Sequence, residues 1–372
     1  MKNRSLAWKI PLALVLVLVA SEIAARAFLP TKLLLPFVAI DPLLGHKGPP
    51  GGDVVIWNNK LRYNERGFRE LPLVKGKRAP SGQIAWLGDS MIEAMTIGDY
   101  EHFSSQVEAQ TGAHGELFAA GDWGTLQELL AFREYGGKAE KLRAVVLGFS
   151  SLTDFVNNSP EFASRYQSKM DFLRPYARFE NGRMHVFSVR PWYQALRSVS
   201  RLFLLFDNAR ITRSLGSPVR MPSDCKANPN SVPLQAYFTA NTPEWESAVL
   251  LTAYLLEELK RESTKTRTPF LAVYLPNDFE LLDDKWEDTV RGPTEFCYPN
   301  QVLGRRENER KFLEAAKKAG VDAVSLYDYF AAEIKKQKGN SIFLDDGHFN
   351  PLGHTLFANE MVRQLRQRKI VD

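Results

Sequence analysis

Short apolar runs alternate with amphipathic stretches from residue 84 onward, and this alternation constrains the fold more than any other feature of the chain. The apolar runs predict five strands, at residues 84–87, 116–120, 144–149, 270–275 and 323–326. The amphipathic stretches predict helices at residues 103–110, 125–135, 244–262, 307–319 and 353–368. Such strands, separated by helices, form a parallel sheet that is covered on both faces. We therefore expect a three-layer α/β/α fold of flavodoxin-like type, with ligands bound beyond the carboxyl ends of the strands.

The pattern divides the chain into an N-terminal apolar segment, a connecting segment and a main domain, at residues 1–29, 30–82 and 83–372. Residues 150–240 interrupt the alternation of strands and helices as an insertion. Five apolar residues in this insertion recur at helical spacing: Trp192, Leu196, Val199, Phe203 and Phe206. They predict a helix that packs its apolar stripe on the main domain. The alternative is a lid, or a surface that faces a membrane or a glycan.

The N-terminus begins with basic residues, and a stretch of twenty largely apolar residues follows, Ile10–Leu29. Twenty residues of helix span about 30 Å, the thickness of a bilayer's hydrocarbon core. We expect a single-pass membrane anchor with its N-terminus in the cytoplasm, because Lys2, Arg4 and Lys9 precede the apolar stretch. A cleaved signal peptide is the alternative. Either segment would send the main domain to the periplasm or the exterior.

The net charge of +5 is concentrated in two places, the N-terminal segment and residues 151–220, where eleven basic residues face five acidic ones. The remainder of the chain is acidic, so we expect no nucleic-acid partner. Cys225 and Cys297 are the only cysteines. They form either one disulfide, in an oxidising compartment, or two separate thiols. No histidine or acidic residue shows metal-ligand spacing, and we expect neither a metal nor a cofactor.

Three residue types needed for acyl transfer occur in two short motifs. Gly88-Asp89-Ser90 directly follows the first predicted strand, and Asp345-Asp346-Gly347-His348 lies near the C-terminus. A serine needs a base to remove its proton, the base is often histidine, and a carboxylate orients the imidazole. Ser90 and His348 fill the first two roles, and Asp345 fills the third. Asp346 is the alternative carboxylate.

These motifs resemble the sequence blocks of the SGNH (GDSL-type) hydrolase family. Leu87-Gly88-Asp89-Ser90 matches the first block, Gly121-Asp122-Trp123-Gly124 the second, and Asp345 to His354 the last. In addition, Asn64–Arg69 resembles an element of membrane-anchored bacterial members. The resemblance implies Ser90 as nucleophile, Asp345 and His348 as its partners, and Gly121 as an oxyanion-hole residue. It also implies that the side chain of Asp346 points elsewhere.

One block departs from the family pattern. Family members carry an asparagine after the third strand, and this chain has Thr153 at that position. A threonine hydroxyl is a hydrogen-bond donor, but it is shorter than the asparagine amide. Three readings stay open: Thr153 completes an oxyanion hole with Ser90 and Gly121, another donor replaces it, or the site is weakened.

The resemblance implies a serine esterase or acyltransferase. Its substrate would be ester-linked acyl groups, such as O-acetyl groups, on an envelope glycan or a lipid, and the N-terminal helix would hold the site near them. The alternative is a degenerate SGNH-type domain that binds a glycan or a protein partner without turnover, and Thr153 is the feature that favours it.

Overall fold

The computed structural model describes residues 4–28, 38–56, 59–74, 82–136, 142–151, 153–162, 174–188, 191–215, 234–337 and 341–372. Residues 75–81 of the connecting segment therefore lie outside the described residues, and so does Cys225.

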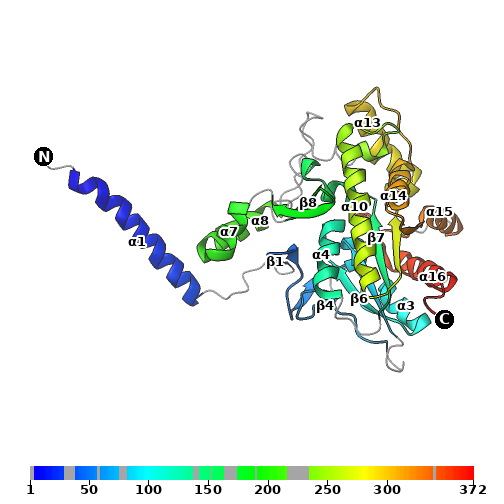
Figure 1. The fold of residues 1–372 in the computed structure, drawn as a ribbon, viewed down its shortest axis with the longest axis horizontal. Helices are drawn as coiled ribbons and strands as arrows, with labels where there is room; N and C mark the ends of the chain where they lie inside the picture. The colour runs from blue at the N-terminus through cyan, green and yellow to red at the C-terminus, as the bar shows by residue number, and fades with distance from the viewer. Residues whose placement is uncertain are drawn as a thin grey trace.

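A five-stranded parallel sheet forms the centre of the main domain (Figure 1). Its strands are β5 (Gln83–Gly88), β6 (His114–Ala119), β7 (Leu142–Ser150), β10 (Phe270–Leu275) and β11 (Asp322–Ser325). They lie in the order β11-β10-β7-β5-β6. The first strand of the sheet thus lies between the second and the third, which is the flavodoxin-like order. The predicted parallel α/β sheet is confirmed, and each observed strand overlaps its predicted range.

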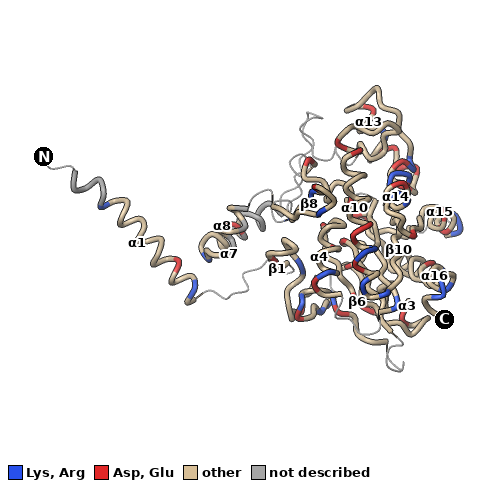
Figure 2. Tube along the Cα trace, in the orientation of Figure 1, with Lys and Arg blue, Asp and Glu red and all other residues tan. Residues whose placement is uncertain are grey.

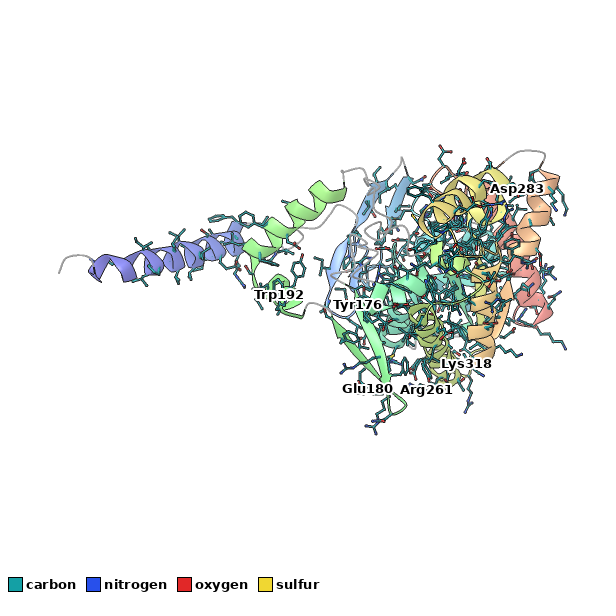
Figure 3. All side chains as sticks on the ribbon, turned by 90° about the horizontal axis from the view of Figure 1, so that it is seen from above. Tyr176, Glu180, Trp192, Arg261, Asp283 and Lys318 are labelled. Atoms are coloured by element: carbon teal, nitrogen blue, oxygen red, sulfur yellow. The ribbon has the colours of Figure 1, made fainter. Side chains whose placement is uncertain are left out.

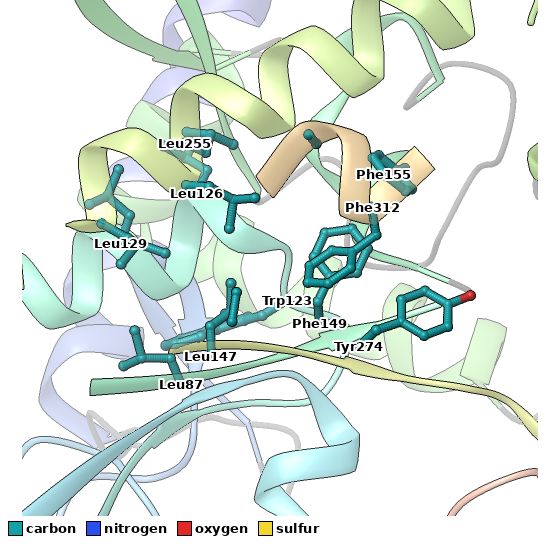
Figure 4. Close-up of a cluster of buried hydrophobic side chains, with 14 of the residues drawn as sticks. Leu87, Trp123, Leu126, Leu129, Leu147, Phe149, Phe155, Leu255, Tyr274 and Phe312 are labelled. Carbon is teal, nitrogen blue, oxygen red and sulfur yellow. The ribbon is translucent and has the colours of Figure 1, made fainter. Parts of the chain in front are cut away.

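Helices cover both faces of this sheet. Side chains alternate along β5: Ala85 and Leu87 pack on one face, and Ile84 and Trp86 pack on the other. The first face is covered by α4 (Thr125–Tyr135), α5 (Asp154–Asn158), α10 (Pro243–Lys265) and α14 (Glu307–Lys318). Figure 4 shows part of this cluster, including Leu87, Leu126, Leu147, Leu255 and Phe312. The second face is covered by α3 (Phe103–Thr111), α15 (Tyr327–Lys336) and α16 (Pro351–Gln367).

Several small elements were not predicted from the sequence. Two antiparallel hairpins precede the sheet, and they are β1 (Ala39–Asp41) with β2 (Gly45–Lys47), and β3 (Asp53–Ile56) with β4 (Asn59–Arg62). A further hairpin, β8 (Pro175–Glu180) with β9 (Arg183–Ser188), lies in the insertion. A short helical segment, η2 (Gln235–Tyr237), precedes α10. Four more follow β10, and they are α11 (Asp278–Leu281), α12 (Asp283–Trp286), η3 (Glu287–Arg291) and α13 (Gly292–Cys297).

The insertion contains two helices where the apolar spacing predicted one. They are α7 (Pro191–Val199) and α8 (Arg201–Leu215). The break falls at Ser200, whose hydroxyl accepts the Phe203 N–H at 3.1 Å and so caps the start of α8. The predicted packing of the stripe on the main domain is also wrong, because Trp192, Val199 and Phe206 are exposed.

Helix α1 (Arg4–Phe28) projects from the main domain, and α7 and α8 lie between the two (Figure 1). It contains a 20-residue stretch, Lys9–Phe28, with a mean hydropathy of 2.0, long and apolar enough to cross a membrane; a signal sequence has the same properties. Figure 2 shows a run without charged residues along the middle of this helix. Cys297, the last residue of α13, is disulfide-bonded.

Candidate active site

Ser90 lies at the carboxyl end of the central strand. β5 ends at Gly88, and the short helix α2 (Ser90–Glu93) begins two residues later. The Asp89 carboxylate caps this helix by accepting the Met91 N–H at 2.9 Å. The side chain of Ser90 is thereby held at the first position of α2, at the edge of the sheet where β5 and β7 adjoin and where ligands bind in this strand order.

Two glycines on neighbouring strands allow α2 to lie directly on the end of the sheet. Gly88 and Gly148 are register partners on β5 and β7. A Cβ on Gly88 would lie 2.3 Å from Ile92 Cγ1, and one on Gly148 would lie 2.6 Å from Ile92 Cδ1. The buried Ile92 side chain occupies the space that both glycines leave. The position of Ser90 therefore depends on Gly148, which is far from it in the sequence.

The structure brings Ser90 and His348 together. The Ser90 Oγ and the His348 Nε2 are 2.9 Å apart, across 258 positions of sequence. When Nε2 accepts the hydroxyl proton, the ring proton resides on Nδ1. The described part of the chain thus contains a serine in hydrogen-bond contact with a base.

The carboxylate near the imidazole is that of Asp346, whereas the sequence predicted Asp345. The Asp346 Oδ1 lies 3.1 Å from His348 Nδ1 and accepts the His348 N–H at 3.1 Å. The Nδ1 contact is an ion-pair distance without hydrogen-bond alignment. A tight turn explains the choice: Leu344 N–H donates to His348 O at 2.7 Å, and Gly347 has φ +85°. The turn folds Asp346 back on His348, and Asp345 makes no ion pair with His348 in the described chain.

The backbone N–H of Gly121, a predicted oxyanion donor, is already engaged. It donates to Glu93 Oε2 at 2.7 Å. Glu93 is 2% exposed, and its other oxygen accepts the Tyr63 hydroxyl at 2.9 Å. Burial raises the pKa of Glu93 to about 7, although Tyr63, Gly121 and Arg69 favour the ionised form. A titratable carboxyl thus competes for the amide that the sequence assigns to the oxyanion.

Thr153 is engaged as well. Its hydroxyl donates to Asp89 Oδ2 at 2.9 Å. A hydroxyl has one hydrogen, so this geometry leaves none for an oxyanion. Of the three predicted donors, the Ser90 N–H at the start of α2 is the one with no hydrogen-bond acceptor among the described residues.

Residues of the connecting segment hold these loops in place, and sequence analysis gave them no role. Arg69, 1% exposed, donates to the carbonyls of Glu93 and Ala94 at the end of α2 and to that of Ile97 in the loop that follows. His46 Nε2 contacts the Gly121 carbonyl at 2.8 Å. The Asn64–Arg69 element was noticed by resemblance alone. The position of Asn64–Arg69 before the first block was the only signal in the sequence. Neither Arg69 nor His46 belongs to a periodic pattern of apolar residues.

Buried carboxyl groups surround the back of the site. Burial raises the pKa of Asp89, and it raises those of Glu128 and Asp154 well above the ordinary value. The three acids repel one another electrostatically. Coulombic attraction to His348 lowers the pKa of Asp89 and so opposes the effect of burial on this residue. In the described part of the chain, no group of three or more His, Cys, Asp and Glu side chains is arranged to hold a metal.

His354 has a packing role. It is 1% exposed, and its Nδ1 accepts the Phe103 N–H at 3.2 Å. Burial, with Arg69 and His348 nearby, lowers the pKa of His354 to about 3, so the ring is neutral.

No family model and no curated protein sequence matches this chain. Solved structures do. A lipase/acylhydrolase from Enterococcus faecalis is 11% identical with a TM-score of 0.37, and the match covers 77% of this chain and 96% of that one. The acetyl xylan esterase AlAXEase is 12% identical, with a TM-score of 0.38 and coverages of 76% and 99%. A lipolytic G-D-S-L protein from Veillonella parvula is 10% identical, with a TM-score of 0.35 and coverages of 77% and 100%. These three structures are named as a lipase/acylhydrolase, an acetyl xylan esterase and a lipolytic G-D-S-L protein.

Proposed function

We propose that this chain is an SGNH-type serine hydrolase or acyltransferase that acts on ester-linked acyl groups. The observation that carries the proposal is the 2.9 Å contact between Ser90 Oγ and His348 Nε2. Ser90 attacks the ester carbonyl while His348 takes its proton, and His348 then protonates the leaving alcohol. Water, or a hydroxyl of an acceptor, attacks the acyl-serine in the second half of the reaction.

The carboxylate that supports His348 is Asp346 in this proposal, with Asp345 retained as the alternative from the family pattern. Asp346 is favoured by its 3.1 Å distance to Nδ1. The oxyanion is bound by the N–H groups of Ser90 and Gly121, the latter after Glu93 releases it. We assign Thr153 to holding Asp89, since its hydroxyl donates there.

The substrate class follows from the N-terminal helix. A helix that anchors the chain in a membrane keeps the domain at the cell surface or in the periplasm, where O-acylated envelope glycans and lipids occur. Helix α1 supports this localisation by its length and hydropathy.

Fluorophosphonate labelling of the full chain in detergent tests the proposal. We expect labelling of the wild-type chain and none of Ser90→Ala or His348→Ala. Asp346→Asn and Asp345→Asn are a matched pair: each removes one charge from adjacent, exposed positions. We expect Asp346→Asn to slow labelling at least fivefold and Asp345→Asn to leave it within twofold. A folded wild-type chain that is not labelled would refute the proposal.

A second candidate is a binding domain without turnover. The occupation of the Gly121 N–H by Glu93, and of the Thr153 hydroxyl by Asp89, favours it. Thr153→Asn separates the two. A large gain in esterase rate would indicate an enzyme limited by its oxyanion hole, whereas absence of turnover in both forms would favour binding.

A further inference from the structure

The helices α7 and α8, residues 191–215, form what we call the α7–α8 platform, and it bears apolar side chains that are largely exposed among the described residues. Trp192 is 62% exposed and Phe206 is 77% exposed. Val199 is 61% exposed as well. Aromatic and aliphatic side chains exposed together on amphipathic helices mark an interaction surface. In Figure 3, the labelled Trp192 lies on the side of the molecule that carries α1.

The platform is bonded to the last turns of α1. The Glu22 carboxylate accepts the N–H groups of Arg201 and Leu202, at 2.8 and 3.0 Å, so it lies on the N-terminus of α8. The Ser200 hydroxyl donates to it at 3.0 Å. From the same face of α1, Arg26 donates to the Val199 carbonyl and pairs with Glu22. The two charges that interrupt the apolar helix are therefore satisfied by the platform.

The depth of this junction fits an interfacial helix. Glu22 is six residues from the end of α1 at Phe28, which is about 9 Å of helix rise. Amphipathic helices at a membrane surface bury their apolar faces roughly 5–10 Å deep. A charged pair at that depth is unfavourable in lipid unless protein groups satisfy it, and the platform supplies those groups.

The platform also packs on the connecting segment. Tyr193 is buried and packs with Phe203, Val38 and Ile40, and Ile40 belongs to β1. Its sequence carries Arg197, Arg201, Arg210 and Arg213 against one acid, Asp207, which is buried. A net positive segment is attracted to anionic lipid headgroups.

We propose that the α7–α8 platform lies in the lipid interface on the side of the catalytic domain, with Trp192, Val199 and Phe206 in contact with lipid. The occupant is the bilayer that α1 crosses. Contacts with α1 on one side and with β1 on the other fix the position of the platform relative to the membrane-spanning helix. This proposal does not depend on the catalytic activity of Ser90.

Site-directed fluorescence in proteoliposomes tests this. Cysteine replaces Val199 or, as control, Val302, which is 68% exposed and lies outside the platform. The full chains, labelled with an NBD fluorophore, are reconstituted in phosphatidylcholine–phosphatidylglycerol vesicles that contain doxyl lipids. We expect quenching at residue 199 at least twofold stronger than at residue 302. Equal quenching at both positions would overturn the proposal.

A second pair of labelling positions keeps the test decisive if a variant of the first pair does not fold. Leu196 on α7 and Leu313 on α14 are 39% and 38% exposed, so they match in side chain and in exposure. Far-ultraviolet circular dichroism identifies the folded variants, and the same twofold difference is expected. Mass measurement of the membrane-extracted chain supplies an independent test, because removal of α1 by a signal peptidase would also overturn the proposal.

Discussion

Replacing Glu93 by glutamine is expected to change the pH dependence of turnover. In the wild-type chain, ionised Glu93 accepts the Gly121 N–H at 2.7 Å and sets a negative charge beside the oxyanion site. Gly121 is close to both groups, because a Cβ on it would lie 3.7 Å from Glu93 Oε2 and 3.9 Å from Ser90 Cβ. The protonated carboxyl competes less for the amide, since a charged acceptor makes the stronger hydrogen bond.

The magnitude follows from the pKa of about 7 that burial gives to Glu93. Above that pH the protonated fraction falls tenfold per unit, so about a tenth remains at pH 8. The wild-type kcat should therefore decline with a slope of −1 above pH 7. In Glu93→Gln the side chain is neutral at every pH, so its kcat should stay level to pH 9. At pH 8 the variant should be about tenfold faster, and near pH 6 the two chains should match.

The assay is kcat against pH on p-nitrophenyl acetate, a small ester that needs no glycan recognition. Tyr63→Phe is the control, because the Tyr63 hydroxyl favours ionised Glu93. Its loss raises the pKa of Glu93, so the decline should move to higher pH. Arg69 and Asp89 also act on this carboxyl, with opposite signs, and stay unchanged. The same decline in Glu93→Gln as in the wild-type chain would refute the reasoning.

Three further substitutions test the geometry of the site and of the core. Thr153→Val should lower kcat less than tenfold, because its hydroxyl donates to Asp89; a loss of about 10²–10³ would mark Thr153 as an oxyanion donor after all. Gly88→Ala should abolish fluorophosphonate labelling, since the added methyl group would lie 2.3 Å from Ile92 Cγ1; labelling at the wild-type rate would contradict this. Glu280→Gln should gain about 3 kcal/mol of unfolding free energy relative to wild type between pH 4 and 8. Burial raises the pKa of Glu280 to about 7, so the wild-type chain loses stability as pH rises through 7, whereas the glutamine variant does not. Thermal melts of both chains at pH 5 and 8 measure the difference in stability. A difference that is the same at both pH values would refute this prediction.

The sheet was predictable from the sequence because each of its strands is a short apolar run between helical patterns. β10 was predicted at its observed bounds, Phe270–Leu275, where all six residues are buried. Ser90 and His348 were predictable as partners because each follows a local motif. The hairpins β1–β2 and β8–β9 were missed, since strands of three to six residues with mixed burial carry little periodicity.

The parts of the site that were missed depend on contacts between distant segments. Glu93 looked like an ordinary helical residue, and its role arises because α2 carries it beneath the Gly121 loop. The proximity of Asp346 to His348 arises from the turn that Gly347 allows at φ +85°, which also brings this loop against α11. The side chains of two adjacent aspartates point in different directions, and the order of residue types in a motif does not show which one points toward the histidine.

We predict that Asp89 supports His348 electrostatically, because attraction to His348 favours ionised Asp89, and Asp89→Asn tests that role. When His348 takes the proton of Ser90, its imidazole becomes positively charged, and a nearby negative charge stabilises it. Asp346 is half exposed, so water and salt screen its charge, whereas Asp89 is 2% exposed. Asparagine is as good an N-cap as aspartate, so α2 should persist. We expect Asp89→Asn to lower kcat on p-nitrophenyl acetate at least tenfold, and more than Asp346→Asn does. If Asp346→Asn loses the activity while Asp89→Asn stays within threefold of wild type, the exposed carboxylate is the one that supports the base.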